Sequence, residues 1–491
     1  MPSNIAKNTS FFTLALIIQK VITFFYFTIL ARNLDPDYLG KYYLAISITT
    51  MFSVLIDIGL SNLLTREVAK VNNVKNVDGG AQQQLSAVMA IKLPLAFLAL
   101  TIIYVFVNIL NYPDLIRHLV YLSAIPMLFD SFTTSFFAVI RGFHNLKYES
   151  IASVMYMGIA MFIGLTFLKR GYSLEWIMSA LAIASLFYFF YALFSLILRY
   201  KIFPIPNWRS KLLKNYFFLT IPFGLFALLQ RAFTYLDTVL LSKLASDWDV
   251  GLYQIAFKII FALQFLPMAF IASLYPALAS SWAKIKFSQK DKAETSKQMV
   301  VTFERAINYL TIISLPISVG VITLAGQIMK VFKPEYASAV LPLQIIMASL
   351  WLLFINFPIG ALLNACDRQK INTLNMAVAL GVSISFNIFL IPMYQATGAA
   401  LTVFIANATM FGFGFLQVPN IIKLRPMKLL IPFFKALFAA LIMGAFIWYL
   451  ELVINIFILI PLGALVYFAA LLAFRGLRVA DLMSIKKAFT G

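Results

Sequence analysis

The chain has 491 residues, 62% of them hydrophobic and 12% charged, and a formal net charge of +20. Soluble domains are about 45–50% apolar and about 25% charged, so this composition excludes an ordinary soluble protein and predicts many membrane-spanning segments. The cations lie in short loops between apolar runs, where they suit anionic lipid head groups, so we do not expect nucleic acid as a partner. The one cysteine, Cys366, excludes an internal disulfide framework and a cysteine-based metal site.

Apolar runs of bilayer length follow one another along the whole chain and predict an all-α membrane protein of about fourteen transmembrane helices. No loop between these runs is long enough for a separate soluble domain. The expected spans lie near residues 10–31, 42–60, 85–108, 119–140, 151–168, 174–198, 216–242, 250–276, 306–324, 339–363, 373–391, 396–418, 431–450 and 454–474.

The lysines and arginines between the spans are distributed unevenly, and this bias predicts the orientation. With a cytoplasmic N-terminus, the inside segments carry about 26 cations and the outside loops about 8, in agreement with the positive-inside rule. The sequence therefore predicts a multi-pass protein of the cell (plasma or inner) membrane with both termini in the cytoplasm. An odd number of spans would break the alternation of cation-rich inside segments and cation-poor outside loops, so the bias also favours fourteen spans.

A shift of 211 residues, the separation of Lys20 from Arg231, brings the first span onto the seventh and indicates an internal repeat. The matched residues include Gln19 and Gln230, Lys20 and Arg231, Thr23 and Thr234, Leu30 and Leu241, Gly40 and Gly251, Tyr42 and Tyr253, and Ala45 and Ala256. An even number of spans separates the two copies, so both face the same way, and such halves usually enclose a central substrate cavity. We expect two six-helix lobes, at residues 1–200 and 201–420, followed by a C-terminal helix pair at 421–491.

Several cations lie inside the expected spans, where a charged side chain costs roughly 3 kcal/mol and needs a partner, a wet cavity or a function. Lys20 and Arg231 are about ten or more residues, or about 15 Å, from either helix end, which makes snorkelling difficult. We interpret both as anion contacts that line the cavity, with a buried salt bridge as the alternative. Lys92 and Lys258 lie closer to a helix end, so their positions are compatible with either cavity lining or partial snorkelling.

Two carboxylates, Asp130 and Asp237, also lie well within expected spans. We interpret them first as partners of cations on neighbouring helices; the alternative is a proton or sodium site that couples transport to an ion gradient. Asp57, near the inner end of the second span, is expected at the membrane interface. The buried cations outnumber the buried carboxylates by about two, an excess that favours an anionic ligand such as a pyrophosphate head group.

Catalytic and cofactor motifs have little support in the sequence. His118 and His144 are expected at loop edges, no Asp or Glu cluster has the spacing of metal ligands, and no Gly-rich phosphate loop of an ATPase is present. We therefore expect a transporter that is not an enzyme and that uses no cofactor or metal.

Three stretches resemble a known family. They are ARNLDPDYLGKYYLA at residues 31–45, IDIGLSNLLTREVAK at 56–70 and LDTVLLSKLASDWDVGLYQIAFKI at 236–259. They are similar to Wzx-type oligosaccharide flippases of the multidrug/oligosaccharidyl-lipid/polysaccharide (MOP) exporter superfamily, and the likeness covers essentially the whole chain. The resemblance implies that polyprenyl-pyrophosphate-linked oligosaccharide moves to the outer leaflet by alternating access, for cell-surface polysaccharide biosynthesis. It also implies a cationic cavity, which fits Lys20 and Arg231, but no coupling carboxylate can be matched residue by residue.

The partners expected from this resemblance are a lipid-linked anionic oligosaccharide, membrane lipids, and glycan polymerase or ligase machinery. A small-molecule (multidrug-type) exporter of the same superfamily is the alternative function, and it would need an acidic or apolar cavity. A membrane-embedded glycosyltransferase or ligase is a further alternative, which the short outer loops disfavour.

Overall fold

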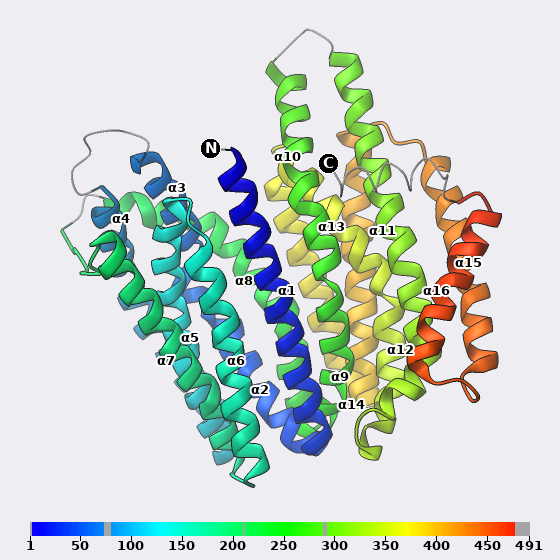
Figure 1. The fold of residues 1–491 in the computed structure, drawn as a ribbon, viewed down its shortest axis with the longest axis horizontal. Helices are drawn as coiled ribbons and strands as arrows, with labels where there is room; N and C mark the ends of the chain where they lie inside the picture. The colour runs from blue at the N-terminus through cyan, green and yellow to red at the C-terminus, as the bar shows by residue number, and fades with distance from the viewer. Residues whose placement is uncertain (1, 73–79, 210–211, 288–291, 477–491) are drawn as a thin grey trace. The chain divides into compact units, whose positions relative to one another are not determined.

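A computed structural model describes residues 2–72, 80–209, 212–287 and 292–476 (Figure 1). The regular elements in these residues are α-helices and two short 3-10 helices. Among them, thirteen helical stretches are long and apolar enough to cross a membrane. The chain is a multi-pass membrane protein, and the expected all-α fold class is confirmed.

The longest helical stretch, Gln369–Asn420, covers two of the predicted spans. Its helix α14 (Gln369–Gln417) is two helices joined at Gln395, where the backbone has a non-helical φ of 51° and ψ of −128°. Just beyond this point, a Cβ at Gly398 would overlap the carbonyl oxygen of Leu390, so the chain passes very close to itself. Each half of α14 is about 35–40 Å long at 1.5 Å per residue, which is enough for one crossing. The interrupted helix therefore accounts for the difference between thirteen stretches and fourteen predicted spans.

The chain divides into two compact units, Met1–Gly251 and Leu252–Gly491. The helices of the first unit are α1 (Pro2–Asn33), α2 (Pro36–Asp57), α3 (Leu60–Asn72), α4 (Gly80–Ile109), α5 (Asp114–Gly142), α6 (Lys147–Lys169), α7 (Leu174–Tyr200) and α8 (Leu212–Leu244), and α9 (Asp247–Leu263) begins at its end. The repeat assigns α8 to the second lobe, whereas α8 packs against α2 within the first unit. The division into lobes near residue 200 stays a prediction from the repeat.

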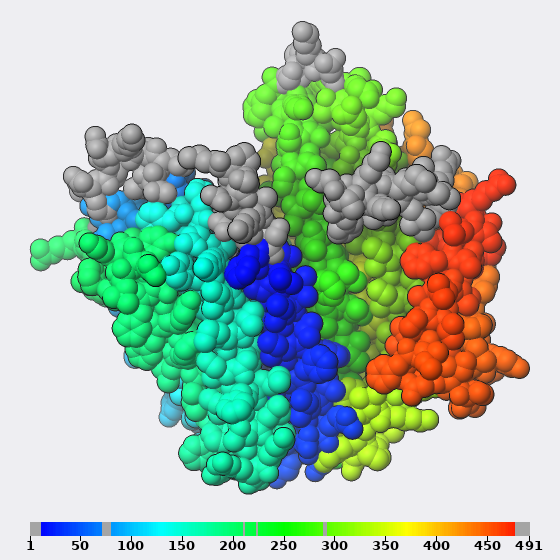
Figure 2. All heavy atoms as spheres, in the orientation of Figure 1, coloured from blue at the N-terminus to red at the C-terminus, as the bar shows by residue number. Residues whose placement is uncertain are grey.

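The first unit is built around α5, which packs against α2, α3, α4 and α7. A buried cluster joins α3, α4 and α5 through Leu64, Val88 and Phe137, each without exposed surface. Helix α1 packs on α6, and Figure 2 shows the two side by side on one face of this unit. The outer side of α1 presents exposed apolar side chains such as Phe25, as expected of a helix in contact with hydrocarbon.

Two glycines that the repeat pairs, Gly40 of α2 and Gly251 of α9, make a reciprocal contact. A Cβ at Gly40 would overlap the carbonyl oxygen of Asp247, and a Cβ at Gly251 would overlap that of Pro36. Pro36 and Asp247 are the first residues of α2 and α9, and they are also 211 residues apart. Each copy's glycine therefore touches the helix start of the other copy, as a local two-fold axis requires.

The second unit contains the predicted C-terminal helix pair. Its remaining elements are α10 (Phe265–Phe287), α11 (Lys292–Met329), η1 (Pro334–Ala339), α12 (Val340–Ala348), α13 (Leu350–Ala365), α14, η2 (Val418–Asn420), α15 (Met427–Leu450) and α16 (Ile456–Ala473). Helices α15 and α16 pack on α11, where Leu315 and Met443 lie in one buried cluster and the Tyr467 hydroxyl donates to the carbonyl of Ile312 at 2.8 Å. The pair is thus anchored to this unit by both apolar and polar contacts.

Candidate functional site

The two repeat-related cations lie in segments with the same local geometry. In α1, the hydroxyl of Thr23 donates to the carbonyl of Gln19 at 2.7 Å. In α8, the hydroxyl of Thr234 donates to the carbonyl of Gln230 at 2.8 Å. A threonine that bonds back to the preceding turn can bend a helix slightly, so the two copies share a local feature as well as residue types.

Lys20 and Arg231 follow directly after these glutamines, and both side chains are exposed. The Arg231 guanidinium donates a hydrogen bond to the hydroxyl of Tyr235, one turn further along α8. In the part of the chain that the structure describes, no carboxylate lies within ion-pair distance of Arg231. An exposed cation far from a helix end is not stable against lipid tails, so its surroundings must include water or an anion.

Lys92 has a different environment, because its side chain has no exposed surface. Its ammonium lies 2.5 Å from Oδ1 of Asp57. It also donates to the backbone carbonyl of Ser131 at 2.6 Å and is 3.3 Å from the hydroxyls of Ser61 and Ser131. The Ser61 hydroxyl donates to the same Asp57 oxygen at 2.5 Å.

This Lys92 cluster joins four helices: α2 provides Asp57, α3 provides Ser61, α4 provides Lys92 and α5 provides Ser131. Buried ions need an opposite charge and further hydrogen bonds to offset desolvation, and Lys92 has both. In this structure Lys92 lines no open space. Asp57, expected as an interfacial residue, is the counter-ion that makes the burial of Lys92 possible.

Asp130 of α5 is held by hydroxyl groups. The Ser185 hydroxyl of α7 donates to Oδ1 at 2.6 Å, and the Tyr156 hydroxyl of α6 is 3.4 Å from Oδ2. Within the described residues no cation forms an ion pair with this carboxylate. The partners of Asp130 in this structure are therefore hydroxyl groups and not a cation.

The remaining two predicted residues, Asp237 and Lys258, lie on α8 and α9. Asp237 is buried in α8, with 4% of its surface exposed. Lys258 of α9 is half-buried, and its ammonium is 5.9 Å from the ring centroid of Phe257. The sequence identified the charged residues of these sites, but it missed the serines and the tyrosine that bind them. Only the spacing of four residues between Asp57 and Ser61 could have suggested one such contact.

Comparisons with known proteins agree with this architecture. Residues 5–282 match a protein family described as polysaccharide biosynthesis protein. The chain is 22% identical over 519 residues to the uncharacterized membrane protein MJ1068 of Methanocaldococcus jannaschii, covering 98% of this chain and 97% of that protein. It is 20% identical over 409 residues to the capsular polysaccharide biosynthesis protein CapF of Staphylococcus aureus, covering 82% and 96%. A 180-residue stretch is 22% identical to the probable flippase AglR of Haloferax volcanii, covering 36% of each chain.

Solved structures show the same fold. The lipid II flippase MurJ in an inward closed conformation superposes with a TM-score of 0.75 at 16% identity, covering 96% of this chain and 99% of that one. An inward-facing multidrug resistance MATE transporter of the MOP superfamily superposes with a TM-score of 0.66 at 12% identity, covering 84% and 98%. At these identities the likeness concerns the fold.

Proposed function

Because the chain belongs to the polysaccharide biosynthesis protein family, we propose that it is a flippase for lipid-linked oligosaccharide. The proposed reaction is transfer of a polyprenyl-pyrophosphate-linked oligosaccharide from the cytoplasmic to the outer leaflet by alternating access, for cell-surface polysaccharide. Relatives named as a probable flippase and as a capsular polysaccharide biosynthesis protein support this proposal, as does the fold shared with a lipid II flippase.

The observation that carries the proposal is the matched pair Lys20 and Arg231. Both are exposed, both follow a glutamine at the same register of the repeat, and both lie far from the ends of apolar helices. Cationic side chains in such positions select anions. A pyrophosphate is the only anionic part common to every substrate of the proposed class, so Lys20 and Arg231 are the residues proposed to bind it.

The other charged residues take secondary roles in the proposal. Lys258 is half-buried and is proposed as a further anion contact, whereas Lys92 is proposed to stabilise the first unit. Asp130 is proposed as a group that couples transport to a proton or sodium gradient. Asp237 is proposed as the partner of a cation on a neighbouring helix, with ion coupling as its alternative role. The cations in the proposed cytoplasmic loops would attract the anionic lipid to that leaflet.

The direct test is translocation of a lipid-linked oligosaccharide in liposomes by purified Lys20→Ala, Arg231→Ala and the double variant. A hydrogen bond to a charged group contributes about 1.5–3 kcal/mol, so each single variant should lose roughly tenfold or more in rate. Arg170→Ala removes an exposed cation from the loop after α6 and is the matched control. Transport at the wild-type rate in both single variants would contradict the proposed binding site.

The multidrug-type exporter remains the alternative, since MATE transporters share the fold. An exporter of lipophilic cations would confer drug resistance on a sensitive strain, and Lys20→Glu would then improve its function. A flippase instead predicts no resistance and a loss of function in Lys20→Glu. Glycan bond formation by the purified protein would indicate the transferase or ligase alternative.

A further inference from the structure

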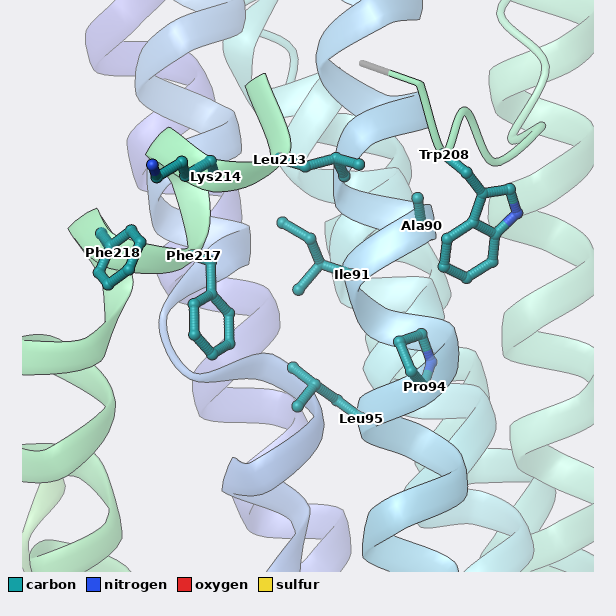
Figure 3. A pocket seen from close by; sticks show the side chains of 9 residues that line it. All are labelled: Ala90, Ile91, Pro94, Leu95, Trp208, Leu213, Lys214, Phe217 and Phe218. Carbon is teal, nitrogen blue, oxygen red and sulfur yellow. The ribbon is translucent and has the colours of Figure 1, made fainter. Parts of the chain in front are cut away.

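An apolar groove of about 360 Å³ lies between α4 and the start of α8, within the first unit (Figure 3). On one side it is lined by Ile91, Pro94 and Leu95 of α4. Phe217 and Phe218 of α8 line the opposite side. No part of this groove coincides with Lys20, Arg231 or the Lys92 cluster.

One wall of the groove is held in place by hydrogen bonds between α4 and the segment that connects α7 to α8. The side chain of Gln82 makes two hydrogen bonds to the backbone of Phe203, at 2.5 and 2.8 Å. The backbone N–H of Asn207 donates to the carbonyl of Ser86 at 3.1 Å. These contacts hold the next residue, Trp208, against α4, where its ring forms one wall of the groove in Figure 3.

Water is a poor occupant of this space. A water molecule held away from bulk solvent needs two to four polar partners. The lining provides only two polar side chains, Lys214 and Trp208. In a bilayer the groove is therefore filled by hydrocarbon.

Basic residues lie at and beside the groove. Lys214 lines it and is exposed, in the first turn of α8. Trp208, at 59% exposure, lies in the segment before α8, and tryptophan with a basic residue is typical of the membrane–water interface. Arg209 follows at once in the sequence, so the segment that leads into α8 adds a second cation. A hydrocarbon chain that ends in a phosphate matches both the apolar lining and the basic residues beside it.

We propose that this groove is a docking site, distinct from the Lys20 and Arg231 site and occupied before translocation, that binds the first isoprene units of a polyprenyl phosphate or pyrophosphate lipid with the phosphate next to Lys214. The inference rests on the proposed function, because that function requires the polyprenyl chain of the substrate to stay in the bilayer near the protein. A polyprenyl chain is branched and unsaturated at regular intervals. Its methyl groups and double bonds pack well on aromatic faces and branched side chains, which are what Trp208, Phe217 and Leu95 offer.

The test measures binding separately from transport. Wild-type protein in nanodiscs that contain phosphatidylglycerol is irradiated with a polyprenyl phosphate that carries a diazirine on its first isoprene unit, and labelled peptides are located by mass spectrometry. We expect labels in the peptides of α4 and the start of α8. Unlabelled polyprenyl phosphate should remove them, whereas an equal excess of phosphatidylglycerol should not. Removal by both lipids alike would show ordinary annular lipid and overturn the proposal.

Matched variants test the two halves of the site. Lys214→Glu should reduce labelling about fivefold or more, the effect of one basic residue near an anionic lipid, and Arg209→Glu, which changes a neighbouring exposed cation outside the lining, should reduce it less. Phe218→Ala, on α8, should reduce labelling, whereas Phe97→Ala, an exposed phenylalanine of α4 outside the groove, should leave it unchanged. Equal effects within each pair would overturn the proposal.

The two proposals fail in different ways. Transport by the wild-type protein without competable labelling of the groove would refute the groove and leave the flippase intact. Competable labelling without any transport of lipid-linked oligosaccharide would leave a polyprenyl phosphate site and refute the flippase.

Discussion

The Lys92–Asp57 pair illustrates how a charged residue in an apolar helix can be structural. Lys92 has no exposed surface, and its ammonium contacts a carboxylate, a backbone carbonyl and two hydroxyls. Removing one partner from such a pair leaves an uncompensated charge in a medium of low dielectric constant. Each residue of the pair therefore stabilises the buried charge of the other.

We predict that Asp57→Asn and Lys92→Met each lower the free energy of unfolding by about 3–5 kcal/mol, measured by thermal or denaturant unfolding in detergent. The double variant should lose less than the sum of the two, because neither charge is left alone. Lys70→Met breaks an exposed pair with Glu67 and should change stability by about 0–1 kcal/mol. Additive losses in the double variant would contradict the coupling.

Cys366 is a buried thiol between α13 and α14, with 1% of its surface exposed. Burial, with a smaller contribution from the negative charge of Asp367, raises the pKa of this thiol to about 12. The thiolate is the reactive form, so a raised pKa means less thiolate at any pH below 12.

We predict that the thiolate fraction of Cys366 at pH 8 is about a thousandfold below that of an ordinary cysteine, so maleimide labels it slowly. Mass spectrometry of the intact protein would follow the rate, which should rise with pH and on unfolding. An introduced cysteine at exposed Ser173 is the comparison. Equal labelling rates at the two positions in folded protein would be inconsistent with this burial.

At the scale of elements, the reciprocal glycine contact connects the repeat to packing. Gly40 and Gly251 let the starts of α2 and α9 approach until backbone meets backbone. A side chain at either position would collide with a carbonyl oxygen, which cannot move as a flexible side chain can. Glycines that allow close helix approach are a common device in membrane proteins.

We predict that Gly40→Ala and Gly251→Ala each destabilise the protein by about 1–3 kcal/mol, as overpacking does, with similar size because the contacts are equivalent. The double variant should lose less than the sum, since both substitutions separate the same pair of helices. Gly158→Ala, in α6 with nothing within 4 Å of the added methyl, should stabilise slightly. A difference of several kcal/mol between the two destabilising variants would argue against the local two-fold.

At the scale of the whole molecule, the proposed orientation rests on the positive-inside bias, since cations on the proposed cytoplasmic side outnumber those on the outer side by about threefold. We predict that, in a Cys366→Ala background, Ser173→Cys is labelled in intact cells by a membrane-impermeant maleimide. Arg209→Cys should be labelled only after the membrane is permeabilised. Both positions are exposed. The opposite pattern would reverse the proposed direction of transport.

Composition, the length of the apolar runs and the alternation of basic loops between them sufficed to predict an all-α membrane protein with about fourteen crossings. The bilayer interior restricts the choice, because a backbone surrounded by hydrocarbon must satisfy its own hydrogen bonds. The register of the repeat was also readable, since glycine, glutamine and threonine rarely match by chance in leucine-rich sequence. The charged residues of the candidate sites could also be identified from the sequence, because a charged side chain is costly in an apolar span.

Only the tertiary structure decided what each charge contacts. Lys92 and Ser131 are 39 residues apart, and Asp130 and Ser185 are 55 apart, so no local pattern joins them. Lys20 and Lys92 look alike in sequence, yet Lys20 is exposed and Lys92 is buried with partners on three other helices. The sequence by itself determined which groups the bilayer would not tolerate unpaired, because that cost depends on residue type and depth. Which of these charged groups has a partner depends on the helices that folding brings together, and the sequence alone did not show that arrangement.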